Sequence, residues 1–541
     1  MQAKLVLSLL TLVHVAAAGV ASTINELRQK VRTSSGSQHH ARDVDPSQLY
    51  PAHTISVPID HFHNESKYEP HTNDTFELRY WFDASHYKKG GPVIVLEGGE
   101  TDGTERLPYL QKGILAQLAQ ATNGIGVVLE HRYYGKSFPT PDLSTENLRF
   151  LTTQQALADA AYFAQHVVFE GLEDQNLTAP NVPYIAYGGS YAGAFVAFLR
   201  VVYPDIFFGA ISSSGVTKAI YDYWEYFEPI REFGPPDCIS TTQKFTHILD
   251  NLLQSSRNDS SLITQYKSLF GLQNLTYNDD FANVLSTPLG SWQNRNWDPA
   301  VNDPTFFEYC GNITSNSTLY NTTVSKASQA KKLITAGGYG QQASQLTNRL
   351  LNFIGWLNQT SIWPCLSGGQ TADQCFTTHN ATFYEQDDIS QQWRSWPYQY
   401  CTEYGYLQTG SGVPRNQLPL ISRSIDLEYL SIICRDAFNI TTPPDVEIVN
   451  QYGGFDITYS RLAIIGGQAD PWRPATPLAD QAKPRPNTID RPFIEMEGAV
   501  HHWDENGLFP NETTPSLPPK PVADTQKAEA AFVKAWLQEW K

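Results

Sequence analysis

The sequence predicts an α/β fold in which a mostly parallel sheet is interrupted by a large, mainly helical insertion. Short, continuous apolar runs at 93–96, 126–129 and 462–465 are typical of strands that are buried on both faces of a parallel sheet. The stretch between the second and third runs is rich in Asn, Gln and Ser beyond about residue 220, and it contains all 6 cysteines. We therefore expect one sheet domain divided by a disulfide-bonded cap domain at 221–450.

The N-terminal segment indicates a secretory signal peptide at 1–18. A single lysine precedes an apolar run and then a group of alanines, which suits cleavage near Ala18 or Ala21. The run is too short to cross a bilayer as a helix, so a membrane anchor is the weaker alternative. The next residues are polar, and we expect 19–55 to be a flexible arm or propeptide.

Sequons and cysteines both agree with a secretory route. An even number of cysteines without a C-x-x-C spacing favours disulfides over metal binding, and the sequence does not choose among the possible pairings. The Asn-x-Ser/Thr sequons predict glycosylation at Asn64, Asn73, Asn176, Asn258, Asn274, Asn312, Asn316, Asn321, Asn358, Asn380, Asn439 and Asn511.

The charge composition excludes one class of binding partner. A net charge of −17 and a pI near 5.3 argue against a nucleic-acid binder, which needs a basic surface. We expect a protein that is secreted or held in a vacuolar or lysosomal lumen, with no metal, no cofactor and no membrane anchor. The sequence does not indicate an oligomeric state.

The two halves of the sheet domain should come from 56–220 and 451–541. Their alternation of strand and helix is typical of βαβ units. The other predicted elements are a helix at 151–169 capped by Thr152 or Thr153, a strand at 182–187, a helix at 192–203, a strand at 207–211, insertion helices at 243–253 and 327–358, a strand at 493–495 and a closing helix at 524–540.

A Gly-rich turn at 188–193 carries the first catalytic candidate. A serine hydroxyl is a good nucleophile only when a base removes its proton. In α/β-hydrolases the serine occupies a sharp strand-to-helix turn that only small neighbours tolerate, and Ser190 has small residues on both sides. Ala192 departs from the strict G-x-S-x-G pattern, and the plain alternative is an ordinary serine in a Gly-rich turn. We predict an α/β-hydrolase fold with Ser190 as nucleophile.

Chain order predicts the partners of this serine. The fold uses serine, then an acid, then histidine. Asp470 follows the strand at 462–465 and is the predicted acid, although an aspartate before proline also suits a plain turn. His501 and His502 are the only histidines beyond the strand at 493–495. We predict His501 as the base and keep His502 as the alternative.

An oxyanion hole needs two N–H donors near the nucleophile. The N–H of Tyr191, at the start of the helix that follows the serine, is the first candidate. The second should come from the loop after the strand at 93–96, where we assign Gly99.

The chain contains the motifs Asp60-His61-Phe62, Glu130-His131-Arg132-Tyr133-Tyr134-Gly135-Lys136-Ser137, Gly188-Gly189-Ser190-Tyr191, Tyr398-Gln399-Tyr400-Cys401-Thr402-Glu403 and Asp470-Pro471-Trp472. Together these motifs resemble the prolyl carboxypeptidase and dipeptidyl peptidase II family of serine peptidases. The resemblance covers most of the chain from about residue 57. It implies a hydrolase domain interrupted by a helical cap and peptidase activity, usually after proline and often at acidic pH. The chain departs from the family at its Gly-x-His loop and at its Gly-Asn-Glu-Gly strand end.

Aromatic residues at 393–406 suggest a pocket for a proline ring, lined by Trp396, Tyr398 and Glu403; plain packing is the alternative. The consecutive charges at 130–132 cannot all face one site, so we expect a buried ion pair or hydrogen bond beneath the active-site loops.

These residues predict a secreted serine peptidase that acts on peptides or proteins after proline, as an exopeptidase rather than an endopeptidase. A secreted esterase or lipase with the same triad and a catalytically silent hydrolase-like glycoprotein are the alternatives. The sequence does not separate carboxypeptidase, dipeptidyl peptidase and endopeptidase.

Overall fold

A computed structural model of the chain describes residues 46–255 and 260–540. The predicted signal peptide, most of the predicted arm and the sequon residue Asn258 lie outside these ranges. Within them, no helix combines the length and the apolar character that crossing a bilayer requires.

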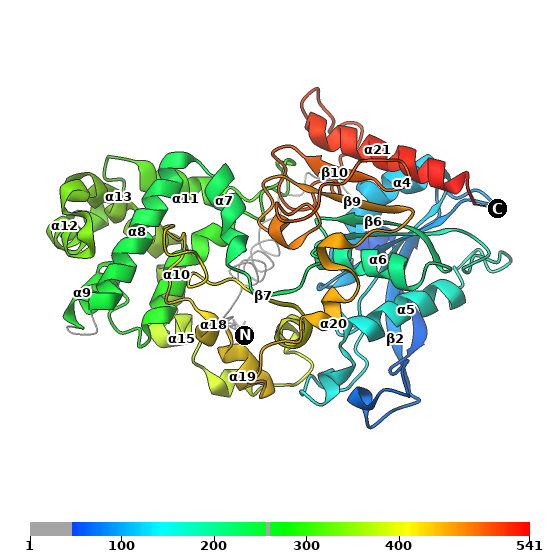
Figure 1. Cartoon of the computed structure of the whole chain (residues 1–541), viewed down its shortest axis with the longest axis horizontal. Coiled ribbons are helices and arrows are strands. Elements are labelled where there is room, and N and C mark those ends of the chain that lie inside the picture. Colours follow the sequence, from blue (N-terminus) through cyan, green and yellow to red (C-terminus); the bar gives the residue numbers. More distant parts are fainter. Residues whose placement is uncertain (1–45, 256–259, 541) are drawn as a thin grey trace, which may run out of the picture.

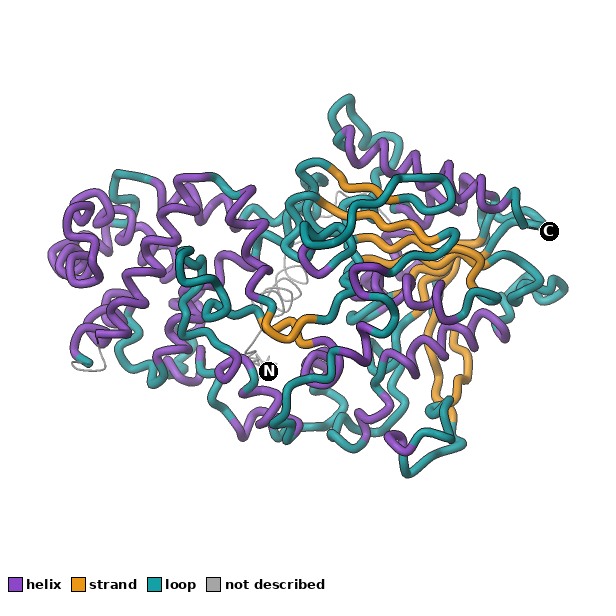
Figure 2. The backbone as a smooth tube through the Cα atoms, viewed as in Figure 1, coloured by secondary structure: helices purple, strands orange, loops and turns teal. Residues whose placement is uncertain are grey.

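A mixed sheet of 8 strands forms one half of the molecule (Figures 1 and 2). Its order is β1-β2-β4-β3-β5-β6-β9-β10; β2 runs antiparallel to both of its neighbours, and the remaining pairs are parallel. The α/β-hydrolase fold has this order, so the predicted fold is confirmed. The strands are β1 (His53–Pro58), β2 (Thr75–Asp83), β3 (Val93–Glu97), β4 (Ile125–Leu129), β5 (Tyr184–Gly189), β6 (Phe207–Ser213), β9 (Leu462–Gly467) and β10 (Phe493–Met496).

Helices cover both faces of the sheet, which explains the continuous apolar runs of its strands. In β3, Ile94 and Leu96 pack in one apolar cluster, and Val93 and Val95 pack in another on the opposite face. The first cluster includes side chains of α3 (Leu107–Gln111), α4 (Ile114–Thr122) and α21 (Lys520–Leu537), and the second includes those of α5 (Thr153–His166) and α6 (Tyr191–Val202).

The insertion lies between β6 and β9 and forms the other half of the molecule, which is mainly helical (Figure 2). A small parallel pair, β7 (Ile220–Asp222) and β8 (Gly405–Leu407), lies where the two halves meet. The helices are α7 (Glu228–Phe233), α8 (Pro236–Ser255), α9 (Ser261–Phe270), α10 (Asn278–Gly290), α11 (Thr305–Thr314), α12 (Ala327–Ile334), α13 (Ala343–Leu357), α14 (Trp363–Leu366), α15 (Ala372–Phe376), α16 (Ala381–Tyr384), α17 (Ser395–Gln399), α18 (Leu427–Leu430), α19 (Ile432–Phe438) and α20 (Glu447–Asn450).

All cysteines are paired within the insertion, as Cys238–Cys310, Cys365–Cys375 and Cys401–Cys434. The first bond joins α8 to α11, and the last joins the turn after α17 to α19. These bonds restrict the conformations of the unfolded insertion.

Candidate active site

Ser190 lies in the turn between β5 and α6. Its backbone has φ 61° and ψ −126°, a strained conformation for a residue with a side chain. A Cβ atom on Gly188 would lie 2.2 Å from the Ala192 carbonyl oxygen, and one on Gly193 would lie 2.6 Å from the Ser213 carbonyl oxygen. Both positions therefore require glycine, which explains the small residues that flank the serine.

Three side chains from the carboxyl ends of parallel strands meet at this turn. The Ser190 hydroxyl oxygen lies 2.8 Å from His501 Nε2, and His501 Nδ1 lies 2.9 Å from Asp470 Oδ2. Asp470 follows β9 and His501 follows β10, and their exposed fractions are only 1% and 6%. The Trp472 N–H also donates to Asp470 Oδ1 over 2.9 Å. The three side chains thus form a hydrogen-bonded serine–histidine–aspartate arrangement.

The surroundings favour an ionised aspartate beside a neutral histidine. Burial tends to raise the pKa of Asp470, but the charge and hydrogen bond of His501 bring this pKa below its ordinary value. Burial lowers the pKa of His501, and the neighbouring His502 lowers it further. A neutral His501 that donates from Nδ1 to Asp470 has Nε2 free to accept the serine proton.

His502 has a different partner. Its Nδ1 lies 2.7 Å from Glu505 Oε2, and its backbone N–H donates to Ser214 Oγ over 2.9 Å. The Glu505 carboxylate offsets the effect of burial and raises the pKa of His502 above its ordinary value. The structure therefore brings His501, and not His502, to the serine hydroxyl.

The two backbone segments that are predicted to supply oxyanion donors lie next to each other. Tyr191 is the first residue of α6, where helical N–H groups have no partner within the helix. In the opposite loop the Gly98 N–H is engaged, since it donates to the Leu129 carbonyl oxygen over 2.8 Å. Gly99 has φ +68°, and a Cβ atom there would lie 3.3 Å from the Ala192 Cβ. The Gly99 loop is thus packed against the start of α6.

An aromatic row runs from Tyr191, the residue after the serine, through Trp472, the second residue after Asp470, to Tyr223. Its contacts place Tyr191 beside Trp396 and Tyr404, and Tyr406 beside Trp472. We define the aromatic row, with its ring-centroid distances, as Tyr191–Trp396 (5.5 Å), Tyr191–Tyr404 (5.4 Å), Tyr404–Tyr406 (5.9 Å), Tyr406–Trp472 (5.2 Å) and Trp472–Tyr223 (5.4 Å).

Comparison with known proteins assigns this chain to a family. Residues 57–514 match the family described as serine carboxypeptidase S28. The chain belongs to this family. It is 57% identical to a probable extracellular serine carboxypeptidase of Arthroderma benhamiae, over 92% of this chain and 69% of that protein. It is 30% identical to the serine protease vicPa of Bipolaris victoriae, over 80% of this chain and 82% of that protein. The protein is a secreted serine-type peptidase.

Among solved structures, the fold is similar to that of a proline iminopeptidase from Mycobacterium smegmatis. The two chains are 12% identical, with a TM-score of 0.36 over 90% of this chain and all of the other. This similarity is too low to support a substrate.

Only one of the three residues predicted for the pocket of this S28 peptidase belongs to the aromatic row. Trp396 contacts Tyr191, whereas the Tyr398 ring packs on Phe438 at 5.5 Å. Glu403 accepts hydrogen bonds from the N–H and hydroxyl of Thr153 at 3.0 and 2.7 Å, so its carboxylate stabilises the start of α5. The backbone N–H groups in the first turn of α5 have no partners within the helix, and this explains the buried carboxylate of Glu403 at that point.

Sequence reasoning missed two residues at the far end of the row. The Tyr223 hydroxyl donates to the Pro471 carbonyl oxygen over 2.9 Å, and Gln293 Oε1 accepts from Trp472 Nε1 over 2.7 Å. Each lies more than a hundred residues from its partner in the chain, and no local pattern marks either one.

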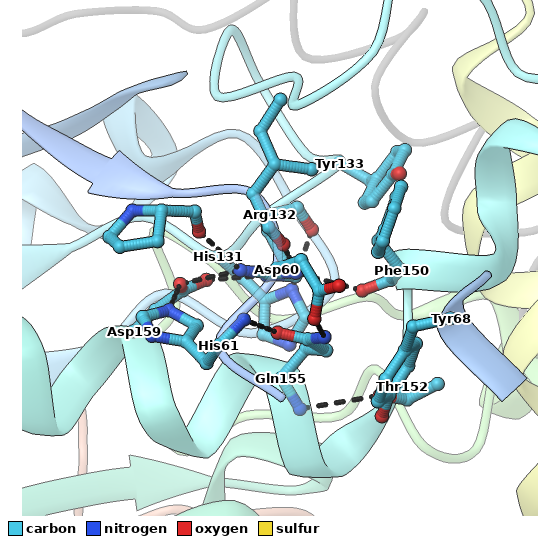
Figure 3. A network of polar contacts seen from close by, with 12 residues as sticks. Asp60, His61, Tyr68, His131, Arg132, Tyr133, Phe150, Thr152, Gln155 and Asp159 are labelled. Carbon is cyan, nitrogen blue, oxygen red and sulfur yellow. Dashed lines mark hydrogen bonds and ion pairs between the residues drawn. The ribbon is translucent and has the colours of Figure 1, made fainter. Parts of the chain in front are cut away.

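Buried polar contacts connect the Asp60-His61 motif and Arg132 to α5 (Figure 3). Arg132 Nε and Nη2 donate to the Asp159 carboxylate over 2.5 and 2.6 Å, and His61 Nε2 lies 2.8 Å from the same carboxylate. Gln155 binds the His61 N–H and the Asp60 carboxylate. The predicted buried ion pair is present, and it fastens α5 to two loops.

A second chain of hydrogen bonds reaches the turn that carries Ser190. His131 Nε2 and Gln399 Nε2 each lie 2.9 Å from the Tyr191 hydroxyl oxygen, and the Tyr134 hydroxyl donates to Gln399 Oε1. Burial lowers the pKa of His131 to about 4, so this imidazole is neutral. Glu130 accepts from Arg79 in a separate buried pair. Of residues 130–132, His131 thus contacts the side chain of Tyr191, next to Ser190, whereas Glu130 and Arg132 form buried ion pairs with other partners.

The predicted glycan acceptors differ in the exposure of their side chains. The Nδ2 atom that would carry a glycan is engaged in Asn312, which donates to the Glu308 carbonyl oxygen over 2.8 Å, and in Asn358, which donates to the Phe270 carbonyl oxygen over 3.0 Å. Asn380 is half-buried and caps α16. The exposed acceptors are Asn64, Asn73, Asn176, Asn274, Asn316, Asn321, Asn439 and Asn511.

Proposed function

We propose that this S28 peptidase is an exopeptidase that cleaves after proline, with Ser190 as nucleophile, His501 as base and Asp470 as the acid that orients the base. The observation that carries the proposal is the hydrogen-bonded set of these three side chains at one end of the aromatic row. His502, which is held by Glu505, is not needed as a base in this scheme.

Acylation follows from the geometry of the three side chains. As the Ser190 oxygen attacks the scissile carbonyl carbon, its proton passes to His501 Nε2, which lies 2.8 Å away. The ionised Asp470 stabilises the imidazolium that forms and holds the ring by Nδ1. His501 then gives the proton to the leaving amine, and the acyl group remains on the serine.

Hydrolysis of the ester repeats these steps with water as the nucleophile. His501 takes a proton from the attacking water and returns it to the Ser190 oxygen. Negative charge on the tetrahedral intermediates would be held by the N–H of Tyr191 and by an N–H of the Gly99 loop. A donor of this kind typically contributes about two to three orders of magnitude in kcat.

The aromatic row suits a proline ring on the acyl side of the bond. Proline lacks an N–H donor, so aromatic side chains that contact a proline ring leave no substrate donor without a hydrogen bond. Trp396 and Tyr404 pack beside Tyr191, the residue next to the nucleophile. This continuity from nucleophile to ring faces favours proline at the cleaved position.

Contacts between the insertion and both catalytic loops favour cleavage near a chain end. Trp292 Nε1 donates to the Ala469 carbonyl oxygen over 2.8 Å, and Trp503 Nε1 donates to the Arg295 carbonyl oxygen over 2.8 Å. The segment 292–297 thus covers the loops that carry the acid and the base, and it would obstruct a long polypeptide that continued past them.

Cleavage of a mixed peptide library, mapped by mass spectrometry, tests the proposal. We expect products that arise from cuts after proline near one terminus, with none from the Ser190→Ala variant. Internal cuts would contradict the exopeptidase mode, and cuts without regard to proline would contradict the role of the aromatic row.

A further inference from the structure

Gln399 is a residue of the insertion whose buried side chain reaches the residue next to the nucleophile. It ends α17, and its exposed fraction is 0%. Its Nε2 donates to the Tyr191 hydroxyl oxygen over 2.9 Å, and its Oε1 accepts from the Tyr134 hydroxyl over 2.5 Å. The motif at 398–403 that contains Gln399 has no part in the proposed chemistry, so the purpose of this contact is still to be explained.

His131 fixes the direction of the hydrogen bonds in this chain. Its Nδ1 lies 2.7 Å from the Arg132 carbonyl oxygen, which can only accept, so Nδ1 carries a proton. Burial lowers the pKa of His131 to about 4, so at higher pH Nε2 carries no proton and accepts from the Tyr191 hydroxyl over 2.9 Å. The buried Tyr191 oxygen then needs a donor, and the Gln399 amide supplies it.

The side chain of Tyr191 anchors the first turn of α6. Ser190, the residue before this helix, makes no side-chain capping hydrogen bond. The exposed fraction of Tyr191 is 1%, and its ring packs against Trp396 and Tyr404 of the insertion. Because these contacts fix the ring and the two hydrogen bonds fix the hydroxyl, the backbone of Tyr191 cannot tilt without breaking them. Gln399 therefore constrains the N–H that follows the nucleophile.

One short segment of the insertion carries both Gln399 and two members of the aromatic row. Trp396 lies in α17, three residues before Gln399, and Tyr404 lies in the helical turn that follows, five residues after it. A substrate ring that packs on Trp396 or Tyr404 therefore stabilises the position of the segment that holds Tyr191 through Gln399.

We propose that Gln399 is a positioning residue that holds the Tyr191 N–H in the oxyanion hole and couples this donor to the aromatic row. The inference rests on the proposed function, in which the Tyr191 N–H binds the oxyanion and the row receives proline. An oxyanion donor acts in the transition state, so its displacement lowers kcat and leaves KM nearly unchanged. Proline in the row should therefore raise kcat in the wild-type enzyme, and not only lower KM.

Two tripeptides provide the test. A carboxypeptidase and a dipeptidyl peptidase both cleave Ala-Pro-Phe at the bond after proline, and Ala-Ala-Phe is the comparison substrate. Wild-type enzyme should have the higher kcat on Ala-Pro-Phe. Gln399→Leu should lower this kcat by about ten- to a hundredfold, because the donor is displaced rather than removed, and change KM by less than about threefold. The ratio of the two kcat values should fall toward one in this variant.

Gln399→Glu keeps the shape of the side chain and makes the donor depend on pH. An ionised carboxylate cannot donate to the Tyr191 oxygen, whereas a protonated carboxyl group can. Burial raises the pKa of the Tyr191 hydroxyl, and the charges of Glu403 and Glu100 raise it further; both effects also favour a protonated acid at 399. Between about pH 7.5 and 4.5, the kcat of Gln399→Glu relative to wild type should therefore rise as pH falls. Gln399→Leu should show no such recovery.

Gln408→Leu is the matched control, because Gln408 is also a buried glutamine of the insertion, but its amide has no hydrogen-bond partner among residues 46–255 and 260–540. It should leave kcat, KM and the ratio for the two peptides unchanged.

Unchanged kcat in folded Gln399→Leu, or a relative kcat of Gln399→Glu that does not rise at acidic pH, would overturn the role of Gln399 alone. If Gln399→Leu does not fold, the pH dependence of Gln399→Glu decides. Equal losses on both peptides would overturn the coupling to the aromatic row. Failure of the wild-type enzyme to cleave Ala-Pro-Phe would overturn the proposed function and this inference together.

Discussion

At the scale of single residues, two adjacent histidines illustrate how contacts decide roles. His501 and His502 have rings only 4.5 Å apart, yet one contacts Ser190 and Asp470 while the other contacts Glu505. Sequence spacing could not separate them, since both follow the same strand. The distinction comes from Glu505, whose carboxylate lies on the turn that follows and holds the second ring.

This difference predicts unequal effects of matched substitutions. His501→Gln removes the base and should lower kcat by about 10⁴ or more, whereas His502→Gln should lower it by less than about a hundredfold. The measurement is steady-state kinetics on a proline-containing peptide, with circular dichroism to verify folding. Equal, mild losses in the two variants would refute the assignment of the base.

At the scale of elements, α5 depends on a buried ion pair that joins it to the rest of the hydrolase domain. The exposed fraction of Arg132 is 0% and that of Asp159 is 4%, and the latter also contacts His61. Removal of one buried partner leaves the other charge unpaired, and such changes destabilise proteins by about 3–5 kcal/mol.

Asp159→Asn should therefore lower the melting temperature by several degrees, because it leaves Arg132 buried without a counterion. Differential scanning fluorimetry of wild type and variant measures the change. Glu173→Gln is a suitable control, since Glu173 is an exposed residue just beyond α5. An equal melting temperature for wild type and Asp159→Asn would mean that the pair does not hold α5 in place.

Local pattern predicted some elements and not others. The helix at 151–169 is present as α5, and Thr152 caps it by accepting from the Gln155 N–H. The helix expected at 327–358 is instead broken into α12 and α13, since Gly338 has φ +94° and Gly337 packs against Ile248. The Gly337-Gly338 pair indicates such a break in the sequence, but nothing in the sequence indicates that Gly337 packs against Ile248.

The site was predictable where chain order constrains it and unpredictable where only folding brings residues together. Ser190, Asp470 and His501 each follow a strand, and parallel strands deliver their ends to one edge. Tyr223 and Glu403 act through contacts with Pro471 and Thr153, and each pair is separated by about 250 residues. No periodicity or motif in the sequence predicts such contacts.

At the scale of the whole molecule, buried acids bias stability toward acidic pH. Glu529 of α21 has an exposed fraction of 0%, and burial, together with the Asp504 charge, raises its pKa well above the ordinary value. Burial also raises the pKa of Asp504, despite its hydrogen bonds to Ser213 and Tyr187. The folded protein thus binds protons that the unfolded chain releases above about pH 4.5.

The direction in which stability changes with pH follows from this difference in proton binding between the folded and unfolded states. Between the unfolded and folded pKa values of Glu529, stability falls as pH rises, by up to about 1.4 kcal/mol per pH unit for one group. The lowered pKa values of Asp159 and Asp470 act only below about pH 4, where their protonation removes stability. The two groups of acids therefore act in opposite directions, the paired aspartates below about pH 4 and the buried Glu529 above its unfolded pKa. The lowered pKa of His131, about 4, opposes the Glu529 effect below about pH 6.5.

Between pH 5 and about 7.5, the melting temperature of Glu529→Gln should fall less, or rise more, with increasing pH than that of the wild type, because a buried amide has no proton to lose. Thermal unfolding of wild type and variant across this interval measures both slopes. The same slope in both proteins would show that the buried acid does not titrate in this range.

The central claim is that Ser190, activated by His501, is the nucleophile of this peptidase. A fluorophosphonate probe reacts with an activated serine in a folded active site, and mass spectrometry of the labelled peptide identifies the residue. We predict a single adduct at Ser190 on the folded protein, none on Ser190→Ala and greatly slowed labelling of His501→Gln. An adduct at another residue, or folded and active protein that resists the probe, would contradict the assignment.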